Sequence, residues 1–388
     1  MNVVLCYMRL LNQALWKTQR LTDLPASLED WQELIRYSQR QGTEALIYNE
    51  LLKTQVPEEI KQFMKQHCLS TMMAQKTQLA IMAKTVGALK DGGVDSVILK
   101  GFGLAQLYPL PYLRRWGDLD IYVGPEQYHR AAPILRDTFP EAIHHDEEWE
   151  ELKHYCFVFP DGNVIEMHRR ALVFNSRADE KYYYPIEKQA MQEAKQLPEC
   201  HLTVEGKEVI IPEPKFNMLF VFMHAWEHFY EQGAGFKQMA DVALLCRHLQ
   251  QVEGMEAYLE KHLKALHLME AWQMVGYFMH KTLGIQPSEW WLYSNSKHIE
   301  RLGEQFTEKI LSEGLWRPYT SDGKTRDERR EEIKKMNVLA RKWMTLKGRI
   351  MDAKRMYRYA PQYTRHHLWG GIEKGIIRTI HRSQMIDF

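Results

Sequence analysis

Two neighbouring segments decide the fold, and they read Val97-Ile98-Leu99-Lys100-Gly101-Phe102-Gly103 and Gly117-Asp118-Leu119-Asp120-Ile121-Tyr122-Val123. The first predicts a buried strand over 96–99, a glycine turn and a short helix over 104–108. In the second, the period of two along a strand puts Asp118 and Asp120 on one face. A strand, a glycine turn, a helix and a carboxylate strand together indicate a cradle for a phosphate.

Paired carboxylates at this spacing indicate a metal site. Two anions a few ångströms apart repel each other unless a cation lies between them, and Mg²⁺ takes oxygen ligands from carboxylates, water and phosphates. Val164-Ile165-Glu166-Met167-His168 offers a third acidic ligand, because strand alternation places Glu166 and His168 on the same face. The alternative interpretation is that Asp-x-Asp is only a cap or a turn.

The residues that carry this pattern resemble a known family. They are Leu99-Lys100-Gly101, Leu104-Ala105, Tyr108-Pro109, Arg114, Gly117-Asp118-Leu119-Asp120-Ile121 and Glu166-Met167-His168. Together they closely resemble the bacterial uncharacterised nucleotidyltransferase family of the polymerase-beta-like superfamily, over about residues 42–249. The resemblance implies an α+β fold, in which helices flank a mixed nucleotidyltransferase sheet and both ends of the chain are helical. It also implies that Asp118, Asp120 and Glu166 are catalytic and hold two Mg²⁺ ions.

The resemblance further implies a reaction. An acceptor hydroxyl attacks the α-phosphorus of a nucleoside triphosphate (NTP) in line, while one ion lowers the pKa of the attacking oxygen and the other neutralises the departing pyrophosphate. Glu166 would ligate the ion nearest the nucleophile and accept its proton. The superfamily modifies nucleic-acid ends, antibiotics, proteins and small metabolites, so the acceptor and the nucleotide base stay open.

Six residues are expected to bind the nucleotide: Lys100, Gly101, Gly103, Arg114, His168 and Lys237. Lys100 offers a point charge to a phosphate, although a lysine at a strand end is also commonly a solvated surface residue. Arg114 either contacts phosphate or forms a salt bridge to the acidic cluster, and His168 is either a participant or a structural hydrogen-bond partner. Phe102 departs from the superfamily, which usually has Gly or Ser at this place.

A second motif supports a different hypothesis, a zinc hydrolase. His224-Ala225-Trp226-Glu227-His228 fits His-x-x-Glu-His, in which two histidines one helical turn apart bind zinc with a downstream acidic ligand, here Glu231 or Asp241. On the nucleotidyltransferase interpretation, His224, His228 and Asp241 belong to a helical segment that packs after the sheet. A third possibility is a non-catalytic nucleotide-binding partner protein, although the intact carboxylates argue against a degenerate site.

Composition indicates a folded protein of a reducing cytoplasm. The chain has 388 residues, 45% of them hydrophobic and 11% aromatic, which argues against disorder and suggests two or three domains. The five cysteines are odd in number and scattered, so neither a disulfide framework nor a zinc knuckle is expected. Residues 1–15 are apolar but too short for a transmembrane segment, and we expect them to form a core helix.

The predicted organisation has four parts: a helical N-terminal region over 1–92, the nucleotidyltransferase core over 93–212, a helical domain over 213–320 and a basic helical region over 321–388. Within the core, we expect a helix from Pro125 to Asp137. We also expect strands over 155–159 and 164–168, which the Asp161-Gly162 turn joins into a hairpin.

The C-terminal end is strongly basic, since residues 324–388 contain 17 Lys plus Arg against 7 Asp plus Glu while the whole chain carries +1. Aromatic residues interleaved with these cations suit a nucleic acid or an anionic membrane surface. Alternatively, an apolar row docks a solvated helix on the core, and this row consists of Ile333, Met336, Leu339, Trp343, Leu346 and Ile350.

Overall fold

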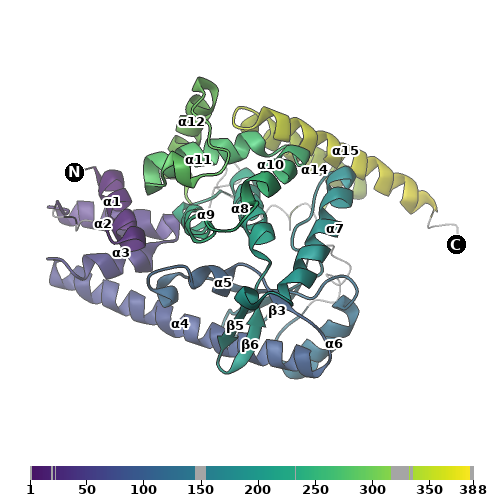
Figure 1. The fold of residues 1–388 in the computed structure, drawn as a ribbon, viewed down its shortest axis with the longest axis horizontal. Helices are drawn as coiled ribbons and strands as arrows, with labels where there is room; N and C mark the ends of the chain where they lie inside the picture. Colours follow the sequence, from purple (N-terminus) through teal and green to yellow (C-terminus); the bar gives the residue numbers. More distant parts are fainter. Residues whose placement is uncertain are drawn as a thin grey trace.

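The computed structural model describes most of the chain, namely residues 2–18, 21, 23–144, 154–231, 233–315, 332 and 335–384. Helices dominate the fold and surround one small mixed sheet (Figure 1), which confirms the predicted α+β class. The longest helix in the described part of the chain, α4, runs along the side of the molecule where the strands lie, while α8 to α12 lie on the opposite side.

The helices are α1 (Val3–Trp16), α2 (Leu28–Gln41), α3 (Glu44–Leu51), α4 (Glu58–Asp91), α5 (Gly101–Ala105), α6 (Tyr128–Thr138), α7 (Arg177–Ala194), α8 (Pro214–Glu231), α9 (Phe236–His248), α10 (Met255–Ala265), α11 (Met269–Leu283), α12 (Lys297–Glu313), α14 (Val338–Met356) and α15 (Pro361–Gln384). The strands are β1 (Val97–Ile98), β2 (Asp118–Tyr122), β3 (His154–Val158), β4 (Val164–His168), β5 (His201–Val204) and β6 (Lys207–Ile210). Short 3₁₀ turns are η1 (Pro111–Leu113), η3 (Pro198–Cys200) and η4 (Pro287–Glu289).

The mixed sheet has the strand order β1, β2, β4, β3. β2 runs antiparallel to β1 and parallel to β4, and β4 pairs with β3 as the antiparallel hairpin that the Asp161-Gly162 turn predicted. The register sets Asp120 directly opposite Glu166. Because side chains alternate along each strand, this register gathers the carboxylates on one face of the sheet.

The other face of the sheet is apolar and buried. Four of its side chains are at most 1% exposed, and these are Leu119, Ile121, Ile165 and Met167. They pack with the second half of α4, with α6 and with the separate β5–β6 hairpin. The helix predicted over 125–137 is therefore confirmed as α6, which covers this face.

Capping residues explain where the first helices begin and end. Ser27 precedes α2, and its hydroxyl accepts the N–H of Asp30 at 3.1 Å. Gly42 ends the same helix with a φ of 69°, a left-handed conformation that suits glycine. Pro57 lies directly before α4, where its fixed φ and missing N–H do not interrupt the helix. The expected core helix at the start of the chain is confirmed as α1, in which Tyr7 is fully buried.

A second and larger hydrophobic cluster joins distant parts of the chain. It unites α1 to α3 and the first half of α4 with α8 to α12, and its buried members include Tyr7, Ile47, Phe220, Trp272 and Phe306. The second half of α4 packs in the sheet cluster instead. Packing thus crosses the boundary expected at residue 92, and the division into four parts stays a prediction.

The C-terminal helices attach by a face other than the predicted one. α14 packs on α8, and α15 packs on α7. Two members of the predicted apolar row are exposed, Trp343 by 65% and Ile350 by 40%, whereas Met336 and Leu346 are half-buried. The buried stripe lies further along the chain, at Met356 and Tyr359, where the helical period brings a different set of residues to the core. Ile333 and the Leu339 side chain lie outside the described residues.

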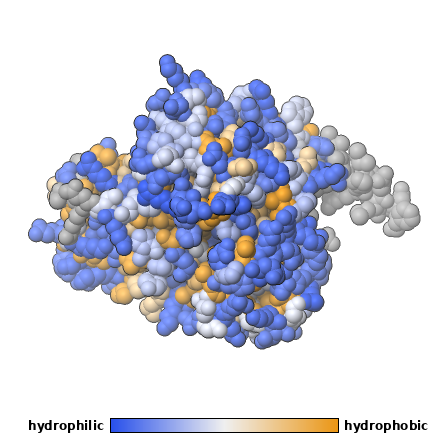
Figure 2. Space-filling model, in the orientation of Figure 1, coloured by the Kyte–Doolittle hydropathy of each residue, from blue (hydrophilic) through white to orange (hydrophobic). Residues whose placement is uncertain are grey.

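Figure 2 shows hydrophilic residues over most of one face, with apolar residues in patches between them. Within the described parts of the chain, every helix is too short or too polar to cross a membrane.

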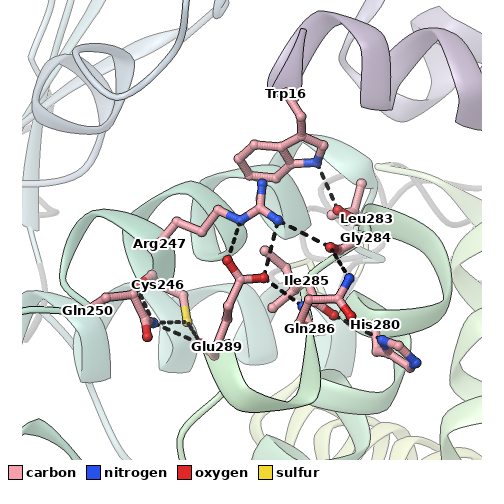
Figure 3. Close-up of polar contacts among 10 residues, drawn as sticks. All are labelled: Trp16, Cys246, Arg247, Gln250, His280, Leu283, Gly284, Ile285, Gln286 and Glu289. Atoms are coloured by element: carbon pink, nitrogen blue, oxygen red, sulfur yellow. Dashed lines mark hydrogen bonds and ion pairs between the residues drawn. The ribbon is translucent and has the colours of Figure 1, made fainter. Parts of the chain in front are cut away.

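A cluster of polar contacts fastens α1 to the helical side of the molecule (Figure 3). The Arg247 guanidinium on α9 donates to both carboxylate oxygens of Glu289, at 3.1 and 3.2 Å, and to the Gly284 carbonyl at 3.1 Å. Its Cζ lies 3.9 Å from the ring centre of Trp16, the last residue of α1. The Trp16 indole N–H donates to the Leu283 carbonyl at 2.8 Å. One arginine therefore connects α1, α9 and the turn after α11.

Replacing Arg247 with alanine is expected to lower the free energy of unfolding by about 1–3 kcal/mol, because a forked ion pair and a cation–π contact are lost together. Arg247→Lys should recover only part of this, since an ammonium cannot form the fork. Arg36→Ala, on the exposed face of α2, is the control and should change stability by less than about 0.5 kcal/mol. Urea denaturation measures all three, and wild-type behaviour of Arg247→Ala would contradict the assignment.

Candidate active site

Three carboxylates meet on the polar face of the sheet. Asp118 and Asp120 come from β2, and Glu166 comes from the paired strand β4. One oxygen from each lies within 4.8 Å of the others. Asp120 is only 4% exposed, whereas Asp118 and Glu166 are half-buried. The structure thus brings together the three residues that the sequence analysis selected.

Two cations surround the Asp120 carboxylate. Nζ of Lys100 and Nε2 of His168 each lie 2.9 Å from its Oδ1. Burial alone would raise the pKa of Asp120, but Lys100 and His168 outweigh it and hold this pKa well below its usual range. The pKa of Asp118 is raised, first by the neighbouring charge of Asp120 and then by burial. The two carboxylates of the Asp-x-Asp pair therefore differ in their affinity for a proton.

His168 is fully buried beside the carboxylates. Its Nδ1 lies 3.2 Å from the Arg170 carbonyl, which can only accept a hydrogen bond, so Nδ1 carries the hydrogen. Its Nε2 faces Asp120 and also lies 3.3 Å from Oε2 of Glu166. Burial lowers the pKa of His168, but the hydrogen bonds to Asp120 and Glu166 raise it above the usual value. His168 is therefore a hydrogen-bond partner of Asp120 and Glu166, which is one of the two roles expected from the sequence.

Lys100 occupies a strained backbone position. Its φ of 49° and ψ of −123° fall where glycine is normal, and such positions cost about 1–3 kcal/mol in other residues. Its Nζ lies between Asp120 and the Nε2 of His224, which is 3.3 Å away. Burial would lower the pKa of Lys100, but Asp120, Asp118 and Glu166 raise it. The strained backbone of Lys100 therefore places its ammonium in a buried ion pair with Asp120.

The glycines after Lys100 allow close packing. Gly101 begins α5 with a φ of 23°, and a Cβ there would lie 3.3 Å from the Trp116 ring. A Cβ on Gly103 would lie 3.0 Å from Ile211. Phe102, the departure from the superfamily pattern, is buried in the sheet cluster. Its ring therefore belongs to the apolar core.

Arg114 has a partner that the sequence analysis did not predict. Its Nε and Nη2 donate to the two carboxylate oxygens of Asp241 on α9, at 2.7 and 2.6 Å. Its Nη1 donates to the Gly101 carbonyl at 3.1 Å, and the Tyr108 hydroxyl also donates to Asp241 at 2.8 Å. The expected salt bridge to the acidic cluster is thus corrected to a buried pair with Asp241. This pair attaches the segment before β2 to α9.

Lys237 lies one turn before Asp241 on the same helix. Among the described residues it forms neither a hydrogen bond nor an ion pair. Burial, followed by the nearby charge of Arg114, lowers the pKa of Lys237 to about 8, while Asp241 and Asp118 act in the opposite direction. Its ammonium is thus available to a further anion.

The histidines of the His-x-x-Glu-His motif flank the carboxylate site. Nε2 of His224 lies 3.1 Å from Nε2 of His228 and also contacts Lys100. Asp241, one of the suggested zinc ligands, is held by Arg114. Within the described parts of the chain, the groups that could hold a metal include neither His224 nor His228. These contacts favour the interpretation in which the motif packs against the sheet.

Two neighbours of the site were missed by the sequence analysis. His154 lies opposite His168 in the β3–β4 pair, and pairing the predicted strands about the Asp161-Gly162 turn could have found it. Gln78 of α4 donates to the Gly117 carbonyl at 2.9 Å and fixes the backbone just before Asp118. The contact of Gln78 could not be predicted, because no sequence pattern distinguishes this glutamine from the others in the long helix α4.

Comparison with known proteins identifies the family of this chain. The family model described as "Uncharacterised nucleotidyltransferase" matches residues 27–284, which is more than half of the chain. The protein therefore belongs to this nucleotidyltransferase family. Among solved structures, an antigenic nucleotidyltransferase-like protein from Paracoccidioides brasiliensis is similar at 16% identity, over 49% of this chain and 87% of that chain, with a TM-score of 0.30. No curated protein matches the chain.

Substitutions at Lys100 should reveal the strain in its backbone. Lys100→Ala and Lys100→Gly both remove the ammonium, but only glycine relaxes the turn, so the glycine variant should be more stable by about 1 kcal/mol. At the exposed helical Lys76 the order should reverse, because glycine costs about 1 kcal/mol relative to alanine within a helix. Thermal or urea denaturation of the four variants measures both differences. The same order at both positions would show that Lys100 is unstrained.

Glu187 of α7 holds the segment after β4. Its Oε2 accepts the N–H of Ala171 at 2.9 Å, and its Oε1 lies 3.5 Å from the Arg170 guanidinium. The side chain is fully buried, and this burial raises its pKa from 4.5 to about 7 in spite of these two partners. The carboxyl is therefore partly protonated near neutral pH.

This raised pKa predicts a pH dependence of stability. Between about pH 4.5 and about pH 7 the unfolded chain loses the Glu187 proton while the folded protein retains it. The free energy of unfolding therefore falls as the pH rises through this range, and below it the protonated Glu187 makes its full contribution to stability. Glu187→Gln mimics the protonated carboxyl and removes this contribution to the pH dependence, whereas Glu199→Gln at an exposed site should leave it in place. Urea midpoints measured across the window test this, and parallel curves for wild type and Glu187→Gln would refute it.

Proposed function

We propose that this protein transfers a nucleoside monophosphate from an NTP to an acceptor hydroxyl, with Asp118, Asp120 and Glu166 as the metal-binding carboxylates. One observation carries the proposal. Three carboxylate oxygens gather within 4.8 Å on two paired strands, in a chain that belongs to a nucleotidyltransferase family.

The carboxylates fit Mg²⁺, the ion that the family resemblance implies. All three donors are oxygens, which Mg²⁺ prefers. Their negative charge is incompletely balanced, because the pKa of Asp118 is raised by the charge of Asp120 even though Lys100 is close by. Mg²⁺ bound by these residues would neutralise phosphate charge and ease deprotonation of the acceptor hydroxyl.

The chain's own residues would bind the phosphates and accept the proton. The ammonium groups of Lys100 and Lys237 both act on Asp118, so both lie near the carboxylates where phosphate oxygens would bind. The backbone of Gly101 and Gly103 at the start of α5 would lie beside the phosphates, and their lack of side chains lets this turn pack against Trp116 and Ile211. Glu166 takes the proton of the acceptor hydroxyl as that oxygen bonds to the α-phosphorus. The bond from the α-phosphorus to pyrophosphate breaks in the same displacement.

The buried contacts around the site would keep these groups in place during the displacement. His168 orients Asp120 and Glu166, while the Arg114–Asp241 pair holds α9, and therefore Lys237, against the segment before β2. Because effective in-line attack depends on close alignment, we assign His168, Arg114 and Asp241 positioning roles.

The test is to incubate purified protein with each α-labelled NTP, Mg²⁺ and pools of acceptors. The pools cover the three classes that the superfamily modifies: nucleic acid such as tRNA, protein, and small molecules. The expected result is a labelled acceptor together with released pyrophosphate. Asp120→Asn should reduce product formation at least ~100-fold, because the metal and its contribution of several kcal/mol would be lost. Asp137→Asn, at an exposed position on α6, is the matched control and should retain activity.

Two outcomes would reject the proposal. One is the absence of both label transfer and pyrophosphate with every NTP and every pool, and the other is full turnover by Asp120→Asn. Mg²⁺-dependent binding of an NTP without pyrophosphate release would instead identify a non-catalytic nucleotide-binding protein.

A further inference from the structure

A second group of ligand side chains lies beside the three carboxylates. It consists of His154 from β3 with Glu166 and His168 from β4, and one ligand atom of each lies within 4.8 Å of the others. We infer that these three residues bind a divalent transition-metal ion of the Zn²⁺ type. The site is distinct from the all-oxygen group of Asp118, Asp120 and Glu166, with which it shares Glu166.

The distances within this group suit a small coordinated ion. Two ligand atoms that each lie about 2.1 Å from a tetrahedral zinc are about 3.4 Å apart. Nδ1 of His154 lies 3.6 Å from Oε2 of Glu166, and Nε2 of His168 lies 3.3 Å from the same oxygen. Both histidine contacts to Glu166 are therefore close to the separation of two ligand atoms on one bound ion.

The sheet explains why the ligands lie together. The antiparallel register places His154 directly opposite His168, and Glu166 precedes His168 by two residues on the same face of β4. Ligands on paired strands are held more firmly than ligands on loops, because the strand hydrogen bonds fix their Cβ positions. The site is thus built from the most regular part of the fold.

The environment of His168 is that of a metal ligand. A coordinating histidine usually donates the hydrogen of its other ring nitrogen to a carbonyl or carboxylate, which orients the ring. Nδ1 of His168 has this partner in the Arg170 carbonyl at 3.2 Å. Nε2 of His168 lies 2.9 Å from Oδ1 of Asp120 and 3.3 Å from Oε2 of Glu166, so an ion bound on the Glu166 side would replace the hydrogen on Nε2.

The donor types select the class of ion. Two imidazole nitrogens and one carboxylate suit Zn²⁺, Fe²⁺ or Co²⁺, whereas Mg²⁺ prefers oxygen ligands alone. The side chains of His154 and Glu166 are 24% and 21% exposed, although Nδ1 of His154 is itself buried, and fully buried His168 lies beneath them.

This inference goes beyond the proposed function, because metal binding at His154 does not require nucleotide transfer. Metal binding and the proposed transfer both use Glu166, because an ion held by the histidines would restrain the carboxylate that acts as the base in the proposed reaction. Metal loading would therefore change the Mg²⁺-dependent chemistry of the neighbouring group.

The test is a titration of metal-free full-length protein with Co²⁺ in the presence of excess Mg²⁺. Co²⁺ serves as the probe because its visible absorption depends on the type and number of its ligands. We expect saturable binding of one Co²⁺ that Zn²⁺ displaces. His154→Ala and His154→Gln should each weaken binding at least ~10-fold, as expected when a coordinating group is removed. His201→Ala, which removes a histidine from the separate β5–β6 hairpin, should bind as wild type does.

The Co²⁺ titration tests the metal site of His154, Glu166 and His168 independently of the transfer assay. Absence of Co²⁺ binding by wild-type protein, or unchanged binding by a folded His154 variant, overturns the inference. Asp118→Asn should retain the Co²⁺ site while losing transfer, because Asp118 belongs to the all-oxygen group alone. Transfer with Mg²⁺ but without a Co²⁺ site would reject this inference alone, whereas a Co²⁺ site without transfer would reject only the proposed function.

Discussion

The buried charge of Asp120 is the constraint on which the site depends. A carboxylate that is 4% exposed is costly to bury unless cations and hydrogen bonds replace the water it has lost. Lys100 supplies one such contact from the turn after β1, at the cost of a backbone conformation that suits glycine. His168 supplies the other from the adjoining strand, which the parallel register of β2 and β4 makes possible. The turn, the strand pairing and the histidine therefore all contribute to stabilising one buried anion.

The same principle attaches the helical side of the molecule to the sheet. Apolar packing is indifferent to small rotations of a helix, but a buried forked ion pair is not. The Arg114–Asp241 pair fixes α9 against the segment before β2, and the contact between Lys100 and His224 fixes α8 above the same site. The helices that follow the sheet in the chain are therefore oriented by the charged groups of the site.

The sequence predicts the parts of this site that depend on local periodicity. Asp118, Asp120, Glu166 and His168 follow from the alternation of side chains along two strands, and the family resemblance then identifies the sheet. The partner of Arg114 could not be predicted in this way, because Asp241 lies 127 positions further along the chain and no local pattern links the two residues. The place of His154 beside the site could be predicted only from the register of β3 on β4. The buried face of α14 could be predicted only by knowing that this helix packs on α8. Periodicity reports which face is apolar, but tertiary contacts decide which apolar face is used.

The helix α4 has a mechanical consequence for the whole molecule. Its 34 residues make a rod about 50 Å long, one half of which is embedded in the helical cluster and the other half in the sheet cluster. A hinge motion that swung one cluster away from the other would have to bend this rod or pull one of its halves out of an apolar core. The molecule is therefore braced along one edge. Relative movement of the two clusters would meet less resistance on the opposite edge, where shorter elements meet.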